Sequence, residues 1–176
     1  MINFKKTKIK NLEIGTFKEI KDFRGSFSRL FCAEIFKKKI KKINQINKSF
    51  SNKKYTLRGM HYQLSPFSED KIVMCTRGKV FDVAVDLRKN SRTYGKWHSE
   101  ILSEKNHKIF FIPKGFAHGF MTLEKNSEVL YFVSQFYNWE KECGTMYNDP
   151  ILKIKWPAKP SSISKKDLSW KLMKKI

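Results

Sequence analysis

The sequence predicts an all-β protein built as an antiparallel barrel or sandwich. Three observations lead to this fold class: the strand-like apolar runs are short, turn residues recur between them, and helical patterning is scarce. A chain of 176 residues is long enough for one hydrophobic core and short for two. We therefore expect a single domain covering residues 1–176.

The first part of the chain predicts strands and turns, followed by one short helix. Residues 1–31 mix short apolar pairs with Gly15 and Gly25, which is typical of strands joined by turns. Residues 32–44 carry the best helical signal, because apolar residues recur there at near-helical spacing among lysines: Ile35, Phe36, Ile40 and Ile43.

The remainder of the chain predicts a succession of strands. They are expected over residues 56–63, 71–75, 79–87, 97–102, 107–112 and 128–137, with loops or turns at 66–70, 77–78 and 90–95. In residues 79–87 the side chains alternate, so Asp82, Ala84 and Asp86 share one face of the strand. We interpret these two acids as structural.

The net charge of +21 suggests a basic nucleic-acid-binding module as one alternative. The lysines are scattered along the chain, however, and only residues 37–42 form a run, which a solvated face explains. A nucleotide or another small anion suits a basic protein equally well, and we expect no nucleic-acid partner.

Cysteine usage and hydropathy indicate the compartment. Cys32, Cys75 and Cys143 are odd in number and form no CxxC pair, so neither a disulfide framework nor a thiolate zinc site is indicated. No stretch approaches the length of a membrane span, and the start of the chain lacks an apolar run. We expect a cytoplasmic protein without a membrane partner.

The densest polar stretch is residues 56–63, which places a cation, a glycine, an imidazole and an amide within six residues. On a strand, Gly59, His61 and Gln63 point the same way. Arg58 points to the opposite face, unless Gly59 marks a bulge that turns the Arg58 side chain toward His61. A surface strand with an incidental histidine explains the octapeptide as well as a functional site does.

A second dense stretch, residues 113–120, forms a tight turn that delivers His118 to the start of the next strand. A core histidine with satisfied hydrogen bonds is the alternative for His118. The four histidines show no His-x-His spacing, and two residues beyond His61 stands Gln63, a poor ligand. We expect no metal and no other cofactor.

The remaining polar groups make an acid-base set without a metal or a covalent nucleophile. They are His61, Lys71, Tyr131 and His118, with Arg24 and Arg58 as candidate anion clamps. Such groups suit proton abstraction next to a carbonyl, in which a base takes the proton and a cation stabilises the enolate oxygen.

At this point the order of motifs resembles the dTDP-4-dehydrorhamnose 3,5-epimerase family over nearly the whole chain. The motifs that carry the resemblance are Asp22-Phe23-Arg24-Gly25, Leu57-Arg58-Gly59-Met60-His61-Tyr62-Gln63, residues 81–88 and 112–120, Asn148-Asp149-Pro150, Trp156-Pro157 and Ser164-Lys165-Lys166-Asp167. Several motifs in order, at family-like spacings, are much more specific than any one of them.

The resemblance implies an all-β antiparallel jelly-roll (cupin-like) barrel with a few short helices and no metal. It also implies a homodimer that exchanges N-terminal strands, and a nucleotide-sugar substrate, dTDP-4-keto-6-deoxyglucose, which is inverted at C3 and C5. By this likeness His61 is the base, Asp167 orients it, Lys71 stabilises the enolate at O4, and Tyr131 returns a proton from the opposite face.

The same likeness assigns the binding residues. Arg58 and His118 match positions that line the sugar and phosphate site, and the nucleotide positions are matched by Arg24, Gln45, Asn47, Glu142 and Lys166.

The sequence departs from the family at Arg29, where a glutamate associated with the nucleotide is common. The spacing from Gln45 to Arg58 is also one residue longer than is usual in the family. A carboxylate accepts a hydrogen bond from a thymine N–H, whereas arginine only donates. Arg29 therefore raises the hypothesis of a nucleotide other than dTDP, such as CDP or GDP.

Three alternatives stay open from the sequence. An enzyme of this family can invert only C3 or only C5, or act on another nucleotide-linked 4-keto sugar. The chain can instead be the nucleic-acid-binding module considered above, or a sugar-binding cupin without catalysis.

Overall fold

The computed structural model describes residues 2–173. Its strands are β1 (Asn3–Lys6), β2 (Glu13–Thr16), β3 (Glu19–Asp22), β4 (Gly25–Ser28), β5 (Gln45–Ser51), β6 (Leu57–Gln63), β7 (Lys71–Arg77), β8 (Lys79–Asp86), β9 (Trp97–Ser103), β10 (Lys108–Ile112), β11 (Phe116–Thr122), β12 (Ser127–Val133) and β13 (Glu142–Gly144). The helices are α1 (Ala33–Phe36) and α2 (Lys165–Leu168).

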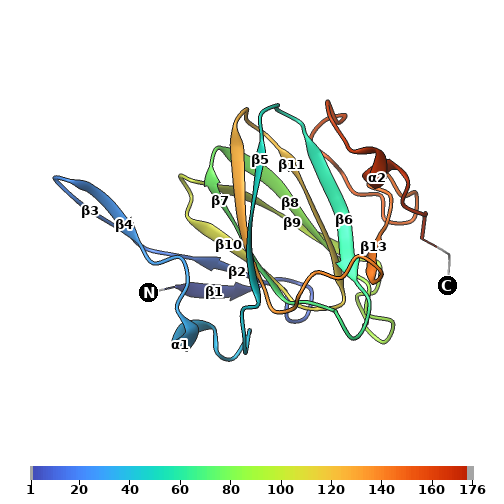
Figure 1. Ribbon diagram of the computed structural model, residues 1–176, viewed down its shortest axis with the longest axis horizontal. Helices are drawn as coiled ribbons and strands as arrows, with labels where there is room; N and C mark the ends of the chain where they lie inside the picture. The colour runs from blue at the N-terminus through green and yellow to red at the C-terminus, as the bar shows by residue number, and fades with distance from the viewer. Residues whose placement is uncertain (1, 174–176) are drawn as a thin grey trace.

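The strands form two facing sheets and a separate hairpin (Figure 1). One sheet has the order β1-β2-β10-β7-β12-β5, the other the order β13-β6-β11-β8-β9, and β3 pairs with β4 alone. The named strands pair antiparallel throughout both sheets. The predicted fold class, an antiparallel jelly-roll barrel, is confirmed. Within the described residues no helix is long and apolar enough to span a bilayer.

Side-chain alternation buries both faces of the central strands. Val73 and Cys75 of β7 pack inside the barrel, while Ile72 and Met74 of the same strand belong to a second apolar cluster on the outer face. That outer cluster is covered by the chain's own segment before β5, through Phe31, Ile35, Phe36 and Ile40. A third cluster joins β8 and β11 to the C-terminal segment through Val83, Val85, Ala117, Leu152 and Ile154. Burial on both faces explains why these strands read as continuous apolar runs.

The predicted helix over residues 32–44 is wrong in extent, because only Ala33–Phe36 is helical. Two backbone hydrogen bonds to the Phe36 carbonyl, from Lys39 and Ile40, end that turn. Continuing the helix would stack lysines of residues 37–42 four residues apart on one face, where like charges destabilise a helix. Burial of Phe36 and Ile40 holds the segment on the barrel instead.

The predicted strand over residues 128–137 ends earlier, since β12 stops at Val133. Beyond it, Ser134 leaves the ladder and bonds the loop before β7. Its N–H donates to the Asp70 carbonyl at 3.1 Å, and its hydroxyl accepts from the Asp70 N–H at 2.8 Å. These local bonds replace the strand pairing and fix the loop.

The β3–β4 hairpin extends away from the barrel (Figure 1). Phe23 at its tip is 98% exposed, and Ile20 and Phe27 are more than half exposed. A hairpin that presents apolar side chains to solvent has no core of its own on which to pack.

The dense polar stretch lies on β6, where Gly59 interrupts the regular pairing with β11. His118 pairs with His61 and Phe120 pairs with Arg58, so the register shifts between them. Gly59 has a φ of +123°, and a Cβ built on it would lie 2.5 Å from the Cα of Gly119. The irregularity turns Arg58 and His61 into the same cavity, as expected if Gly59 marks a bulge.

We expect Gly59→Ala to destabilise the fold strongly. The positive φ alone costs about 1–3 kcal/mol for a residue with a side chain, and the close approach of β11 adds to it. Gly95→Ala is the matched control, because Gly95 also has a positive φ but a Cβ there meets no atom within 4 Å. Urea unfolding should show a loss of at least about 2 kcal/mol for Gly59→Ala and about 1 kcal/mol for the control. Equal losses in the two variants would contradict the importance of the close approach.

Candidate active site

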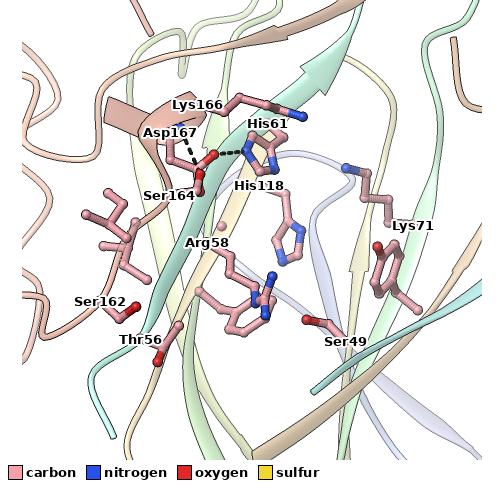
Figure 2. A pocket seen from close by; sticks show the side chains of 15 residues that line it. Ser49, Thr56, Arg58, His61, Lys71, His118, Ser162, Ser164, Lys166 and Asp167 are labelled. Carbon is pink, nitrogen blue, oxygen red and sulfur yellow. Dashed lines mark hydrogen bonds and ion pairs between the residues drawn. The ribbon is translucent and has the colours of Figure 1, made fainter. Parts of the chain in front are cut away.

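A cavity of about 550 Å³ opens between the two sheets, next to the C-terminal segment that carries α2 (Figure 2). A second cavity of about 300 Å³ adjoins it, and the two share His61, Lys71 and Tyr131. His61 comes from β6 of one sheet, whereas Lys71 and Tyr131 come from β7 and β12 of the other. The shared groups therefore face one another across the barrel.

His61 is oriented by Asp167 from α2, 106 residues along the chain. The His61 Nε2 atom lies 2.6 Å from Asp167 Oδ1 (Figure 2). The backbone N–H of Gly59 donates to Asp167 Oδ2 at 3.2 Å. Ser164 caps α2 by accepting from the Asp167 N–H at 3.0 Å. Since an ionised carboxylate only accepts, Nε2 carries the proton of neutral His61 and Nδ1 is the basic nitrogen.

The Asp167 carboxylate stays ionised in this setting. Burial raises its pKa, but the hydrogen bond and charge of His61 and the Gly59 N–H favour the charged form more strongly, and the net pKa is lowered. An ionised Asp167 fixes the imidazole tautomer and stabilises the imidazolium that forms when His61 accepts a proton.

Lys71 and Tyr131 stand on neighbouring strands of the opposite wall. Lys71 is 8% exposed, and its ammonium lies 3.0 Å from the Glu69 carboxylate. Burial raises the pKa of the Tyr131 phenol, with the charge of Arg58 opposing the rise and that of Glu69 adding to it. A phenol with a raised pKa remains protonated at neutral pH, so it can donate a proton.

Arg58 and His118 complete the wall of the larger cavity. The Arg58 guanidinium donates to Ser51 Oγ at 3.2 Å and to the Phe50 carbonyl at 3.0 Å. His118 Nε2 lies 2.8 Å from Oδ1 of the fully buried Asp82. Burial raises the pKa of Asp82, against the opposing charge of His118 and of Lys71.

Asp82, interpreted from the sequence as structural, lies beside the site residue His118. The alternation of residues 79–87 placed it on one face with Ala84, and Ala84 pairs with His118 across the β8–β11 ladder. The sequence therefore predicts which residues share a strand face with Asp82. It does not predict the strand pairing that brings His118 beside Asp82. Asp86, the other acid of that face, bonds Arg88, Ser91 and Thr93 and is structural as expected.

The smaller cavity gathers the residues that the family likeness associates with the nucleotide. Gln45 and Asn47 come from β5 and Glu142 from β13. The Lys166 ammonium lies 2.6 and 2.8 Å from the two Glu142 oxygens, and the Tyr137 hydroxyl donates to Glu142 at 2.7 Å. Burial raises the pKa of Glu142, but the Lys166 and Tyr137 bonds outweigh it, and the net pKa is lowered. Tyr137 was missed by the sequence reasoning.

Arg24 and Arg29 lie outside both cavities of their own chain. Arg24 sits in the β3–β4 turn and binds Asp22 of the same hairpin at 2.7 Å. Arg29 lies just beyond β4, in a separate groove lined by Ile20, Phe27 and Ile35. One chain alone thus brings together ten of the twelve site residues that the sequence predicted, and these two are not among them. The roles of all twelve stay predictions.

The charge of the cavity suits an anionic ligand. Arg58, Lys71 and Lys166 line it together with two histidines. Within residues 2–173, no group of three or more His, Cys, Asp or Glu side chains is arranged to hold a metal ion. The groups present can take a proton, donate a proton and stabilise a negative oxygen.

Known proteins are similar to this chain in sequence and in fold. The model of the dTDP-4-dehydrorhamnose 3,5-epimerase family matches residues 6–175. An enzyme of that name from Sinorhizobium fredii is 44% identical over 151 residues, 84% of this chain and 77% of its own. The epimerase from Legionella pneumophila in complex with dTDP-4-keto-L-rhamnose has a TM-score of 0.92 and 40% identity, covering 98% of this chain and 93% of its own. The Bacillus anthracis enzyme with TDP and PPi bound has a TM-score of 0.94 and 32% identity, covering 98% and 100%.

The Asp167 carboxylate should stabilise the fold in a pH-dependent way. Its pKa is lower in the folded state than the ordinary value of 3.8, so its contribution is complete above that value and is lost as the pH falls through the folded pKa. We expect the difference in unfolding free energy between the parent and Asp167→Asn to be full above about pH 5 and to shrink below about pH 4. Urea unfolding across this range measures it, with Glu124→Gln at an exposed surface pair as control. A difference that widens on acidification would contradict the assignment.

Proposed function

The chain belongs to the dTDP-4-dehydrorhamnose 3,5-epimerase family and is an isomerase, and from this premise we propose how its own residues invert C3 and C5 of dTDP-4-dehydro-6-deoxyglucose. The observation that carries the proposal is the 2.6 Å bond between His61 and the ionised Asp167, on a cavity wall that faces Lys71 and Tyr131. A base and an acid on opposite walls suit inversion at carbon, which requires removing and returning a proton on different faces.

The reaction begins with proton abstraction next to the C4 ketone. Nδ1 of His61 takes the proton from carbon, and the electron pair moves to the ketone oxygen to give an enolate. The Lys71 ammonium stabilises that oxygen. Tyr131 then donates its phenolic proton to the opposite face of the carbon, which inverts the centre. His61 then releases its proton to water and Tyr131 regains one from water, after which the same cycle at the other carbon adjacent to C4 completes the epimerisation.

The nucleotide and the diphosphate occupy the remaining polar walls. The Arg58 guanidinium donates to the Ser51 hydroxyl and the Phe50 carbonyl, neither of which carries a charge. Its positive charge is therefore available to a phosphate. Gln45, Asn47 and Glu142 line the smaller cavity, and Lys166 of the larger cavity bonds Glu142, so together they offer both donors and acceptors to the thymidine part.

The enzyme acts, in our proposal, as a homodimer in which each β3–β4 hairpin enters the partner's site. The hairpin leaves Phe23, Ile20 and Phe27 exposed, and a partner surface would cover them. Strand β5, which carries Gln45 and Asn47, is the outermost strand of its sheet and offers an edge for pairing. A hairpin docked there would bring Arg24 of one chain to the nucleotide of the other, and Arg29 with it.

A cytoplasmic location and a role in supplying rhamnose for polysaccharide synthesis complete the proposal. The free thiols of Cys32, Cys75 and Cys143 are compatible with a reducing compartment.

Exchange with solvent tests the chemistry directly. The protein is incubated in D₂O with dTDP-4-keto-6-deoxyglucose, and NMR follows deuterium at C3 and C5. The parent should incorporate deuterium and invert both carbons, and His61→Ala should do neither. Tyr131→Phe retains the base but lacks the returning acid, so exchange should outlast inversion. Asp167→Asn should reduce exchange less than His61→Ala.

Each outcome of this experiment is informative. Exchange at C3 alone in the parent would make the enzyme a C3 epimerase, and no exchange at either carbon would contradict the proposed substrate. Substantial exchange in His61→Ala would remove His61 as the base. Equal loss of exchange and inversion in Tyr131→Phe would assign Tyr131 another task.

Mixing two inactive variants tests the hairpin exchange. In an exchanged dimer, a hybrid of Arg24→Ala and His61→Ala chains has one site with both lesions and one site with neither. Random reassortment of equal amounts should therefore restore about one quarter of the sites. Turnover at low substrate concentration measures the recovery, with Lys21→Ala in place of Arg24→Ala as the hairpin control. If Arg24 served its own chain, every hybrid site would carry one lesion and the mixture would recover nothing.

A further inference from the structure

We infer that Glu69 is a positioning residue for Lys71: the Glu69 carboxylate holds the buried Lys71 ammonium at its place in the cavity. The inference rests on the proposed role of Lys71 in stabilising the enolate oxygen. Glu69 lies in the loop before β7, two residues ahead of Lys71, and lines the smaller cavity.

The two side chains form an ion pair inside the site. Glu69 Oε1 lies 3.0 Å from Lys71 Nζ, and each side chain is 10% exposed. Among residues 2–173, Glu69 provides the carboxylate within 4 Å of this ammonium. An ion pair with so little exposure is screened weakly by water, so the attraction between the two side chains holds the ammonium in place.

The surroundings make a counterion necessary. Burial disfavours the charged form of a lysine, and the same cavity holds the cation Arg58 and two histidines. Asp82 is the other acid whose charge interacts with Lys71, but its carboxylate is fully buried and bonded to His118. Without Glu69 the ammonium would lose the carboxylate that lies 3.0 Å from it and would move away from this place in the cavity.

Glu69 is itself held in place by Gln63 at the end of β6. The Gln63 amide Nε2 contacts Glu69 Oε2 and donates to the carbonyls of Phe67 at 3.0 Å and Phe136 at 3.2 Å. Its Oε1 accepts from the Asn138 N–H at 2.7 Å. Gln63 therefore ties the loop before β7 to the segment after β12. A carboxylate fixed in this way can fix the long lysine side chain, which otherwise has many rotamers.

Glu69 acts on two groups of the same cavity wall, Lys71 and Tyr131. An ammonium has three N–H donors, so a carboxylate on one side of Lys71 leaves N–H groups for the substrate oxygen. The negative charge of Glu69 also raises the pKa of Tyr131, after the larger effect of burial. Glu69 thus holds the cation in place and favours the protonated phenol, and the proposed reaction requires both.

The test compares Glu69→Gln, which removes the charge at nearly constant size, with Glu69→Asp, which keeps it. For Glu69→Gln we expect kcat for inversion of dTDP-4-keto-6-deoxyglucose to fall about 10- to 100-fold, less than the ~10²–10³-fold expected for Lys71→Met. KM should change less than about threefold, because the effect is on the enolate rather than on binding. Glu69→Asp should recover most of the lost kcat.

The matched control is Glu124→Gln, which breaks an exposed Lys79–Glu124 pair of 2.9 Å and should leave kcat unchanged. The deciding measurement is a double-mutant cycle. In a Lys71→Met background, Glu69→Gln should have no further effect on kcat, since a positioning residue acts only through the group it positions.

Two outcomes would overturn the inference. The first is parental kcat in Glu69→Gln. The second is an equal loss in the parent and in the Lys71→Met background, which would mean that Glu69 supports the loop or touches the substrate directly. Failure of the proposed function is distinguishable, because the parent itself would then not invert the substrate, whereas failure of this inference leaves the parent and Lys71→Met behaving as expected.

Discussion

The site depends on the close approach of two backbones at Gly59 and Gly119. Because neither residue has a side chain there, β6 and β11 come so near that a single added Cβ would lie 2.5 Å from the facing Cα. The irregular pairing turns Arg58 and His61 to one side, and it leaves the Gly59 N–H free to bond Asp167. One local departure from regular pairing thus positions Arg58, the proposed anion clamp, and His61, the proposed base, together with part of the orientation of His61.

Charge compensation organises the rest of the cavity. Most of its basic side chains face a carboxylate from a different element, as with His61 and Asp167, His118 and Asp82, and Lys166 and Glu142. Each pair fixes the position of the basic group, because the carboxylate accepts its N–H. Arg58 differs, since it donates to a hydroxyl and a carbonyl and retains its full charge for an anion. We propose that the paired groups serve the proton transfers and that Arg58 serves the binding of the anion.

The N-terminal part of the chain has a different relation to the site. The segment of residues 29–43 covers the outer face of the larger sheet and contributes to packing. The β3–β4 hairpin before it packs on neither sheet and presents apolar side chains and arginines to solvent. A chain that builds most of a nucleotide-sugar site, yet holds two candidate nucleotide residues at a distance, is consistent with a site completed by a second copy.

The sequence by itself determined the fold class, the alternating faces of residues 79–87 and the position of His61 in a dense polar stretch, because side-chain periodicity and short motifs are properties of neighbouring residues. It also allowed for the bulge at Gly59. The tertiary structure decided which distant groups meet: Asp167 with His61, Asp82 with His118, and Glu69 as a member of the cavity. It ended the first helix at Phe36 and held Arg24 apart from its own site. These outcomes depend on sheet register and on which surfaces are buried, and both are set by packing between segments that lie far apart in the chain.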